Sequence, residues 1–348
     1  MVGERPSIIR KGIKVISMIF GFISTLCLIN SPSINARSNP GWPVIKEFVQ
    51  KLDGFSSMSF PEANVLHLRL QARFGGLNVP EEQMFDWPVD IALDQEGRIY
   101  VLDARDCNIK IFKSNGNFIR TIAQGGSGPG ELNRPWIMRL IKDKIYIADT
   151  GNRRIQVLDL DGKYLKSYRL PLEFGFGMDF DSSGNLYLNS QGFRDDRLIS
   201  VYDNRGRSVR KFGDLEGKSF QYYDFALIKR KIRKGSLPDS FKNDVLLVTD
   251  SRDHVFAVHR ALRKIRIYST SGKLLETVEV RAEEYQKVYR EFLRKNKEIE
   301  NRPAAFYPLY YVNDLAVDGE GNLFILLNEP SQMIIYVYSD QGEFKEKF

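Results

Sequence analysis

Cysteine is scarce in this sequence. Its 348 residues include two cysteines, and Cys27 lies in an apolar N-terminal segment that we expect to be removed. Cys107 would then be alone, which excludes an intrachain disulfide. No histidine lies near Cys107 in the sequence to act as its base, so we interpret it as a lone thiol rather than a nucleophile. A chain of this length can instead be held together by its hydrophobic core.

Histidine is equally scarce. A three-histidine zinc site would need every histidine in the chain, His67, His254 and His259. His254 and His259 fall in one expected strand at an odd separation, and the alternation of side chains along a strand would put them on opposite faces. We therefore expect structural histidines rather than zinc ligands.

The motifs of phosphate binding and serine hydrolysis are missing as well. The glycine-rich run from Gly125 to Gly130 lacks the Lys-Ser/Thr pair that follows in a P-loop. No Gly-x-Ser-x-Gly sequence occurs. Nearly all acidic residues fall in expected turns. The sequence thus identifies no catalytic residue, and it favours a non-enzyme without deciding the question.

The charge balance is only mildly basic. The chain has a formal charge of +7, of which residues 1–36 contribute +3 from four basic residues and Glu4, leaving +4 on the rest. A charge of this size does not argue for nucleic acid. We therefore expect no nucleic-acid partner.

The N-terminus has the pattern of a secretory signal. A basic stretch that ends at Lys14 precedes the uncharged, largely apolar residues 15–29, and small residues lead to Ala36. The apolar run is short for a membrane span, which needs about 20 residues. We expect cleavage after Ala36 and a periplasmic or secreted protein with no stable membrane span. An uncleaved N-terminal anchor is the alternative.

The rest of the chain is organised by a repeat of four short strands. In its clearest copy, strands are expected at residues 91–93, 99–102, 108–112 and 118–122, joined by tight turns that end in Gly97 and Gly116. The turn between the last two strands recurs with Gly162, Gly206, Gly272 and Gly342. The successive steps are 46, 44, 66 and 70 residues, and a period in the forties with four strands per unit is typical of propeller blades.

The number of blades is left open between five and six. Five full repeats are visible, and an alternating strand at residues 64–74 precedes them. Because a propeller must close its ring to remove exposed edges, we expect this strand to complete a sixth blade with the C-terminal strands. The predicted fold is an all-β, six-bladed propeller over residues 58–348, after a linker at residues 37–57. The two long steps predict helical insertions on one face, at about residues 213–244 and 281–311.

Two segments resemble a known family. Residues 149–157, Asp-Thr-Gly-Asn-Arg-Arg-Ile-Gln-Val, resemble the core of the NHL repeat, and residues 125–132, Gly-Gly-Ser-Gly-Pro-Gly-Glu-Leu, resemble a connector of bacterial NHL-like six-bladed β-propeller proteins. The resemblance implies a propeller over about residues 65–348. It does not imply an activity, since such scaffolds host enzymes and binding modules alike.

Two kinds of site are suggested on this scaffold. Asp90, Asp179 and Asp314 precede or begin the inner strands and so could hold a divalent cation such as Ca²⁺ or Zn²⁺ at the channel. This supports the alternative function, a metal-dependent hydrolase or lyase. If no cation binds there, we expect these carboxylates to accept hydrogen bonds from neighbouring backbone amides.

The favoured function is partner binding through one face. The long connections and the loops between second and third strands gather at the same end of the propeller, whereas the opposite end has short, uniform hairpins. Function tends to reside on such variable loops. We therefore expect a monomeric binding or scaffold module that recognises a protein, peptide or glycan through this face, with candidate contacts at Trp87, Arg105, Trp136, Arg153, Arg194 and Arg263.

Overall fold

The computed structural model describes residues 79–169, 177–281, 283–329 and 334–348. Within these ranges the chain forms five four-stranded antiparallel sheets, each made of strands consecutive in sequence. These sheets, here called blades 1 to 5, confirm the five repeats read from the sequence. The expected closing strand at residues 64–74, the signal segment and the linker lie outside the described residues.

The strand boundaries follow the repeat closely. Blade 1 is β1 (Pro88–Leu93), β2 (Ile99–Asp103), β3 (Asn108–Phe112) and β4 (Phe118–Ile122). Blade 2 is β7 (Pro135–Ile141), β8 (Lys144–Asp149), β9 (Arg154–Asp159) and β10 (Tyr164–Arg169). Blade 3 is β11 (Met178–Phe180), β12 (Leu186–Asn189), β13 (Arg197–Tyr202) and β14 (Ser208–Asp214). Blade 4 is β15 (Val245–Thr249), β16 (Val255–His259), β17 (Lys264–Tyr268) and β18 (Leu274–Glu279). Blade 5 is β19 (Val312–Val317), β20 (Leu323–Leu327), β21 (Ile334–Tyr338) and β22 (Phe344–Lys347).

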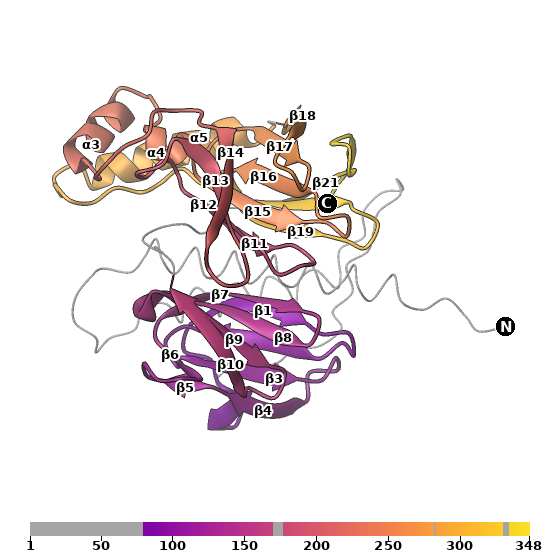
Figure 1. The fold of residues 1–348 in the computed structure, drawn as a ribbon. Coiled ribbons are helices and arrows are strands. Elements are labelled where there is room, and N and C mark those ends of the chain that lie inside the picture. Colours follow the sequence, from indigo (N-terminus) through magenta and orange to yellow (C-terminus); the bar gives the residue numbers. More distant parts are fainter. Residues whose placement is uncertain (1–78, 170–176, 282, 330–333) are drawn as a thin grey trace, which may run out of the picture.

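The first strand of each blade lies nearest the propeller axis. Contacts join β1 to β7, β7 to β11, β11 to β15 and β15 to β19. Figure 1 shows blades 1 and 2 on one side of the molecule and blades 3 to 5 on the other. Side chains from these first strands are therefore the ones placed to line the central channel.

The hairpins at one end of the blades share one pattern of hydrogen bonds. The aspartate that opens the first turn of four blades accepts a hydrogen bond from the backbone N–H four residues later, in the pairs Asp94–Arg98, Asp181–Asn185, Asp250–His254 and Asp318–Asn322. In each pair the side chain of the later residue also contacts the aspartate. An aspartate that bonds its own turn in this way stabilises the hairpin. We call this the hairpin end, and the opposite end the loop end.

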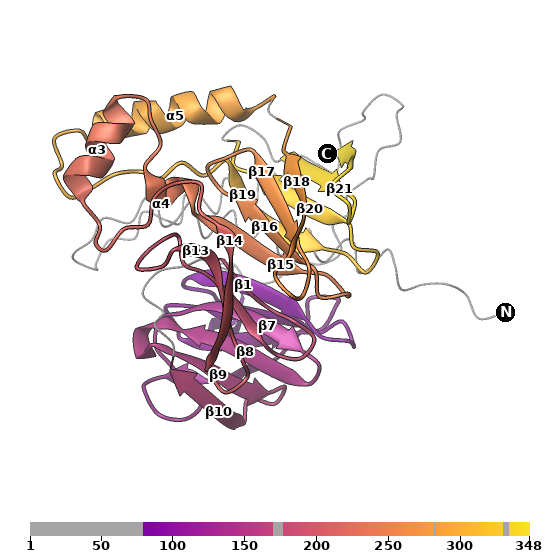
Figure 2. The same cartoon turned by 45° about the horizontal axis from the view of Figure 1, so that its top comes forward.

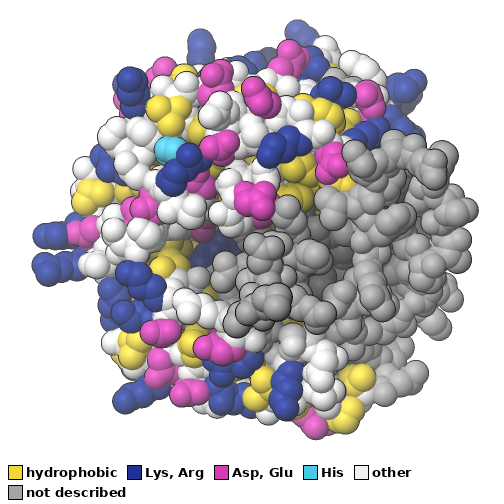
Figure 3. All heavy atoms as spheres, turned by 90° about the vertical axis from the view of Figure 1, so that its right-hand side faces the viewer, with side chains coloured by type: hydrophobic (Ala, Val, Ile, Leu, Met, Phe, Trp, Pro, Cys, Tyr) yellow, Lys and Arg dark blue, Asp and Glu magenta, His cyan; other side chains and the backbone are white. Residues whose placement is uncertain are grey.

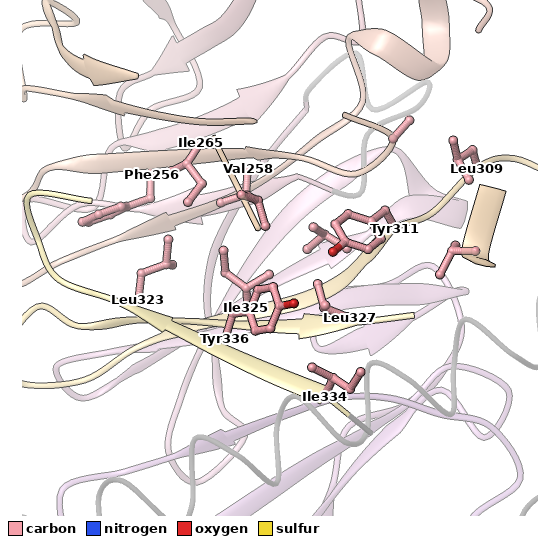
Figure 4. Packing of buried hydrophobic residues seen from close by; sticks show 14 of the residues in the cluster. Phe256, Val258, Ile265, Leu309, Tyr311, Leu323, Ile325, Leu327, Ile334 and Tyr336 are labelled. Atoms are coloured by element: carbon pink, nitrogen blue, oxygen red, sulfur yellow. The ribbon is translucent and has the colours of Figure 1, made fainter. Parts of the chain in front are cut away.

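The largest core cluster joins blades 4 and 5 to the insertions. Figure 4 shows side chains from both blades, among them Phe256, Ile325 and Tyr336, packed face to face. Full burial of one such side chain contributes about 1.5–3 kcal/mol. Because apolar residues fill both faces of the middle strands, neighbouring blades stack on each other as well as pairing within themselves.

The insertions are helical and lie at the loop end. The first holds α3 (Phe225–Arg233) and α4 (Asp239–Lys242), and the second holds α5 (Tyr285–Glu298). The helix predicted for the second insertion is confirmed, and its side chains Val288 and Phe292 are buried in the core cluster of blades 4 and 5. Tyr285 of α5 donates a hydrogen bond to the carbonyl of Ala261, in the loop after β16. Figures 1 and 2 show the three helices together at one end of the molecule.

Four short elements complete the described chain: the 3₁₀ turns η2 (Glu81–Gln83) and η3 (Thr150–Asn152), and the parallel pair β5 (Gln124–Gly125) and β6 (Glu131–Leu132). None of the helices among the described residues has the length and apolar character needed to cross a membrane.

Candidate functional site

Two of the three channel aspartates are bridged by an arginine from the blade between them. Arg139 of β7 places Nη1 3.0 Å from Asp90 Oδ2 of β1, and its Nε 3.0 Å from Asp179 Oδ1 of β11. The remaining lone pairs are used as well. The backbone N–H of Met138 donates to Asp90, and the N–H and hydroxyl of Thr249 both donate to Asp179. This cluster ties together the inner strands of four successive blades.

Asp314 differs from the other two aspartates. Its Oδ1 accepts a hydrogen bond from the N–H of Leu315 at 2.9 Å, and no ion pair to it occurs among the described residues. Burial, together with the negative charge of the neighbouring Asp90, raises the pKa of Asp314 to about 8. Its carboxyl group is therefore neutral at pH 7.

These contacts do not fit a divalent cation. A cation needs carboxylate oxygens with free lone pairs, but Asp90 and Asp179 already share the Arg139 guanidinium. Within the described ranges no group of three or more His, Cys, Asp or Glu side chains is arranged to hold a metal ion. The arrangement supports the plainer expectation, that these carboxylates bond neighbouring amides, with an arginine that the sequence reading did not include.

The histidines within the described ranges are structural, as expected. His254 takes part in the aspartate hydrogen-bond pattern of the first hairpin in blade 4, and its Nδ1 lies 3.1 Å from Asp250 Oδ2. His259 is fully buried, and its Nδ1 lies 2.7 Å from the carbonyl oxygen of Lys242. Burial lowers the pKa of His259 to about 4, so the ring is neutral and donates that bond. His67 lies outside the described residues.

Three of the predicted contact residues are brought together at the loop end. The rings of Trp87 and Trp136 meet edge to face with centroids 6.5 Å apart, and the Arg105 guanidinium lies over Trp87 at 5.1 Å. Arg105 also pairs with Asp86 at 2.9 Å. Both tryptophans are half-buried and pack against the core of blades 1 and 2. Both tryptophans therefore stabilise the fold, and only part of each side chain is accessible to a partner.

The loop around Trp87 is fixed by one buried aspartate. Asp103, at the end of β2, has no exposed surface and accepts hydrogen bonds from the backbone N–H groups of Asp86, Trp87, Arg105 and Asp106. Asp149 has the corresponding place in blade 2, where it accepts from Asn133 N and from the Asn152 and Arg154 side chains. Loop-end aspartates thus position loops, whereas hairpin-end aspartates close turns.

The other three predicted contacts are not joined to the tryptophans by any contact between described residues. Arg153 is exposed, has a left-handed backbone (φ 52°), and forms no ion pair within the described part of the chain. Arg194 donates to the carbonyl of Gln221 in the first insertion. Arg263 pairs with Glu279 at 2.6 Å and lies over the Tyr285 ring of α5. Arg153 is the predicted arginine most available to a partner.

A second group at the loop end was missed from the sequence. Arg260, which follows β16, stacks on Tyr310, which precedes β19, with the guanidinium carbon 3.4 Å from the ring centroid. Its Nη1 lies 3.9 Å from Asp244 Oδ2. Tyr223 of the first insertion donates to Gln191, in the loop after β12. We call these five residues, Gln191, Tyr223, Asp244, Arg260 and Tyr310, the mouth cluster.

The backbone explains why the mouth cluster is rigid. The carbonyl of Arg260 accepts hydrogen bonds from the N–H groups of Tyr311 and Val312, and its own N–H donates to the carbonyl of Asp244. Burial raises the pKa of Asp244 and raises that of Tyr310 to about 12. Arg260 and Asp244 are almost completely buried, while Tyr310 and Tyr223 keep part of their surface exposed. The accessible surface of this cluster is therefore aromatic, backed by a fixed cation.

The comparisons with known proteins settle the family. A family model described as 6-bladed beta-propeller (DUF5128) matches residues 89–302, more than half of the chain. The chain belongs to this family. The residues that the structure describes form five blades.

More distant likenesses agree with the fold. NHL repeat-containing protein 3 of Mus musculus is 32% identical over 89 residues, and the human protein of that name is 33% identical over 89 residues. The matched segment spans 24% of this chain and 26% of either relative. A presumed exported protein of Bacteroides fragilis has a TM-score of 0.50 and 19% identity, covering 78% of this chain and 75% of that one. Virginiamycin B lyase of Staphylococcus aureus has a TM-score of 0.45 and 13% identity, covering 75% and 69%. At 19% identity the Bacteroides fragilis structure shows the fold alone.

Proposed function

We propose that this protein is an exported β-propeller binding module that recognises a protein, peptide or glycan partner with its loop end. The proposal is carried by the gathering at the loop end of groups suited to a partner, the exposed arginines and the mouth cluster; the best defined of these is the mouth cluster. It combines a buried arginine, stacked on a tyrosine, with polar side chains from two blades and an insertion. Such preorganised groups bind a polar partner without paying for their own ordering.

The contrast between the two ends supports this choice. At the hairpin end the aspartates of the repeated turns are engaged with their own backbone. At the loop end Arg153 is exposed without an ion pair to any described residue, and Arg105 keeps about half of its side-chain surface exposed. Cations with this freedom suit an anionic or polar partner.

We further propose that the chain acts outside the cytoplasm, in the periplasm or after secretion, as a monomer. The basic, apolar and small-residue order of residues 1–36 supports export. N-terminal sequencing of exported protein should give Arg37 as the first residue. A chain that starts at Met1 and stays with the membrane would instead indicate an uncleaved anchor.

The proposal is tested by affinity capture of a partner from envelope extract. The amounts captured by wild type, a loop-end variant and a hairpin-end variant are compared. We expect Arg105→Glu/Arg153→Glu to reduce capture at least tenfold, since each reversal places like charge against an anionic partner. The variant should stay folded at the temperature of the capture, because it loses only the exposed contacts of Arg105 with Asp86 and Trp87. The matched control is Arg205→Glu/Lys273→Glu, which reverses two exposed cations in hairpin-end turns. Loss of capture in the control alone would show that the assigned end is wrong.

A further inference from the structure

The first insertion carries an exposed surface of mixed apolar and basic character. Tyr222, two residues before the N-cap residue of α3, exposes 73% of its surface, and Leu227 in the first turn of the helix exposes 36%. Phe225 exposes 41% and packs on Phe306 with ring centroids 5.8 Å apart. The helix then continues into a run of basic residues with no acidic residue among them: Lys229, Arg230, Lys231, Arg233 and Lys234.

Part of this basic run is used within the fold. Lys229 Nζ donates to the carbonyl oxygens of Ile299 and Glu300 at the end of α5, and Lys231 pairs with Asp239 at 2.6 Å. Arg230 and Lys234 are exposed, and neither forms an ion pair with any residue that the structure describes. These two side chains supply positive charge that the insertion itself does not neutralise.

The remaining groups share one side of the helix. Leu227, Arg230 and Lys234 are three and four positions apart and so lie on one face. The buried side chains of α3, Ile228 and Ile232, lie on the other face and pack in the core cluster. We call Tyr222, Leu227, Arg230 and Lys234 the α3 patch.

The patch lies on a projecting part of the molecule. Figures 1 and 2 show α3 at an outer edge of the molecule. On the opposite side of the molecule, seen in Figure 3, basic and acidic side chains are interspersed over the coloured surface. A projecting helix suits a broad flat surface, whereas a compact ligand needs a concave site.

We propose that the α3 patch docks the propeller on an anionic membrane surface. Aromatic and aliphatic side chains enter the boundary between headgroups and acyl chains, while adjacent Lys and Arg side chains contact anionic headgroups. The apolar start of α3 and the basic end of the same face supply both kinds of contact. This inference goes beyond the proposed function, because the mouth cluster and the α3 patch are different surfaces and each can fail alone.

The test is co-sedimentation of the full chain with vesicles of equal parts phosphatidylglycerol and phosphatidylcholine. Wild type should bind these vesicles and bind pure phosphatidylcholine far more weakly. Arg230→Gln/Lys234→Gln should reduce the partition coefficient roughly thirtyfold, from about fivefold for each basic side chain near an anionic surface. Tyr222→Ser/Leu227→Ser should reduce it about tenfold through lost apolar burial.

Two matched controls localise the effect. Leu274→Ser/Leu275→Ser removes exposed apolar surface from β18, where these leucines expose 47% and 46%. Arg205→Gln/Lys273→Gln removes two exposed cations from hairpin-end turns. Neither control should change vesicle binding. Because residues 1–78 are common to every variant, the differences between variants report on the substituted positions.

A direct contact measurement makes the result independent of any other membrane attachment. Leu227→Trp should be quenched by brominated phosphatidylglycerol beyond the level of wild type, and Leu274→Trp should not. Equal quenching at both positions, equal binding to both kinds of vesicle, or α3 variants that bind like wild type would overturn the proposal. So would capture of a protein through the α3 patch without vesicle binding.

Discussion

At the hairpin end of the propeller, aspartates such as Asp94 and Asp318 bond the turns that contain them. At the loop end, Asp103 and Asp149 bond segments that arrive from outside their own turn. The same residue type therefore closes a local hairpin at one end and fixes a distant loop at the other. The repeated hairpin turns use their polar side chains for hydrogen bonds within the turn. Few polar groups are therefore left at that end to bind a partner.

The largest expected loss of stability is at the cluster of Asp90, Arg139 and Asp179 on the inner strands. Arg139→Gln removes the positive charge shared by Asp90 and Asp179. We expect a loss of about 4 kcal/mol in the free energy of unfolding at pH 7, because two buried carboxylates lose their counter-charge. Urea unfolding measures it. Adding Asp90→Asn and Asp179→Asn to Arg139→Gln should restore part of the loss. If the triple variant is no more stable than the single one, the bridge does not have this role.

Asp103 should matter more to stability than its hairpin-end counterpart. Asp103→Ala leaves the N–H groups of four residues without their acceptor, and we expect a cost of about 3 kcal/mol. Asp318→Ala removes bonds to Glu320 and Asn322 only, and we expect about 2 kcal/mol. Thermal unfolding of both variants gives the order. A larger cost at Asp318 would reverse the comparison between the two ends.

Asp314 should make stability depend on pH. The carboxyl pKa is 3.8 in an unfolded reference and about 8 in the fold. Between these values the folded protein holds a proton that the unfolded chain has released, so this contribution is complete below pH 4 and is lost as pH rises through 8. Asp314→Asn should remove this contribution to the pH dependence and be more stable than wild type at pH 8, by up to about 5 kcal/mol. Equal pH profiles for the two proteins would show that Asp314 is ionised throughout.

Much of the fold could be predicted from the sequence because the repeat is local. The turn glycines and the short apolar runs predicted β3 and β4 at their observed residues, and the long step after Gly272 predicted the helical insertion that contains α5. The start of β1 was placed three residues late. A β-bulge between Pro88 and Asp90 keeps Pro88 paired with Asp103, and no local pattern reveals that pairing.

The candidate site was harder to predict because it depends on contacts between blades. Arg139 lies in the apolar strand Pro-Trp-Ile-Met-Arg-Leu-Ile, where one charge gives no sign that it bridges aspartates 49 and 40 residues away. Arg260 and Tyr310 each adjoin a strand end, and only the closed ring brings them together. Positions such as Arg194 and Arg263 were read correctly as loop residues, but contacts with the insertions occupy them.

The central claim is that partners bind at the loop end, and one paired measurement tests it most directly. Equal amounts of wild type, Arg105→Glu/Arg153→Glu and Arg205→Glu/Lys273→Glu are immobilised, and the material captured from envelope extract is compared by quantitative mass spectrometry and glycan analysis. The account predicts that a saturable partner is retained by wild type and by the hairpin-end variant, and is lost from the loop-end variant while all three proteins remain folded at the temperature of the capture. Retention by the loop-end variant together with loss from the hairpin-end variant would contradict it.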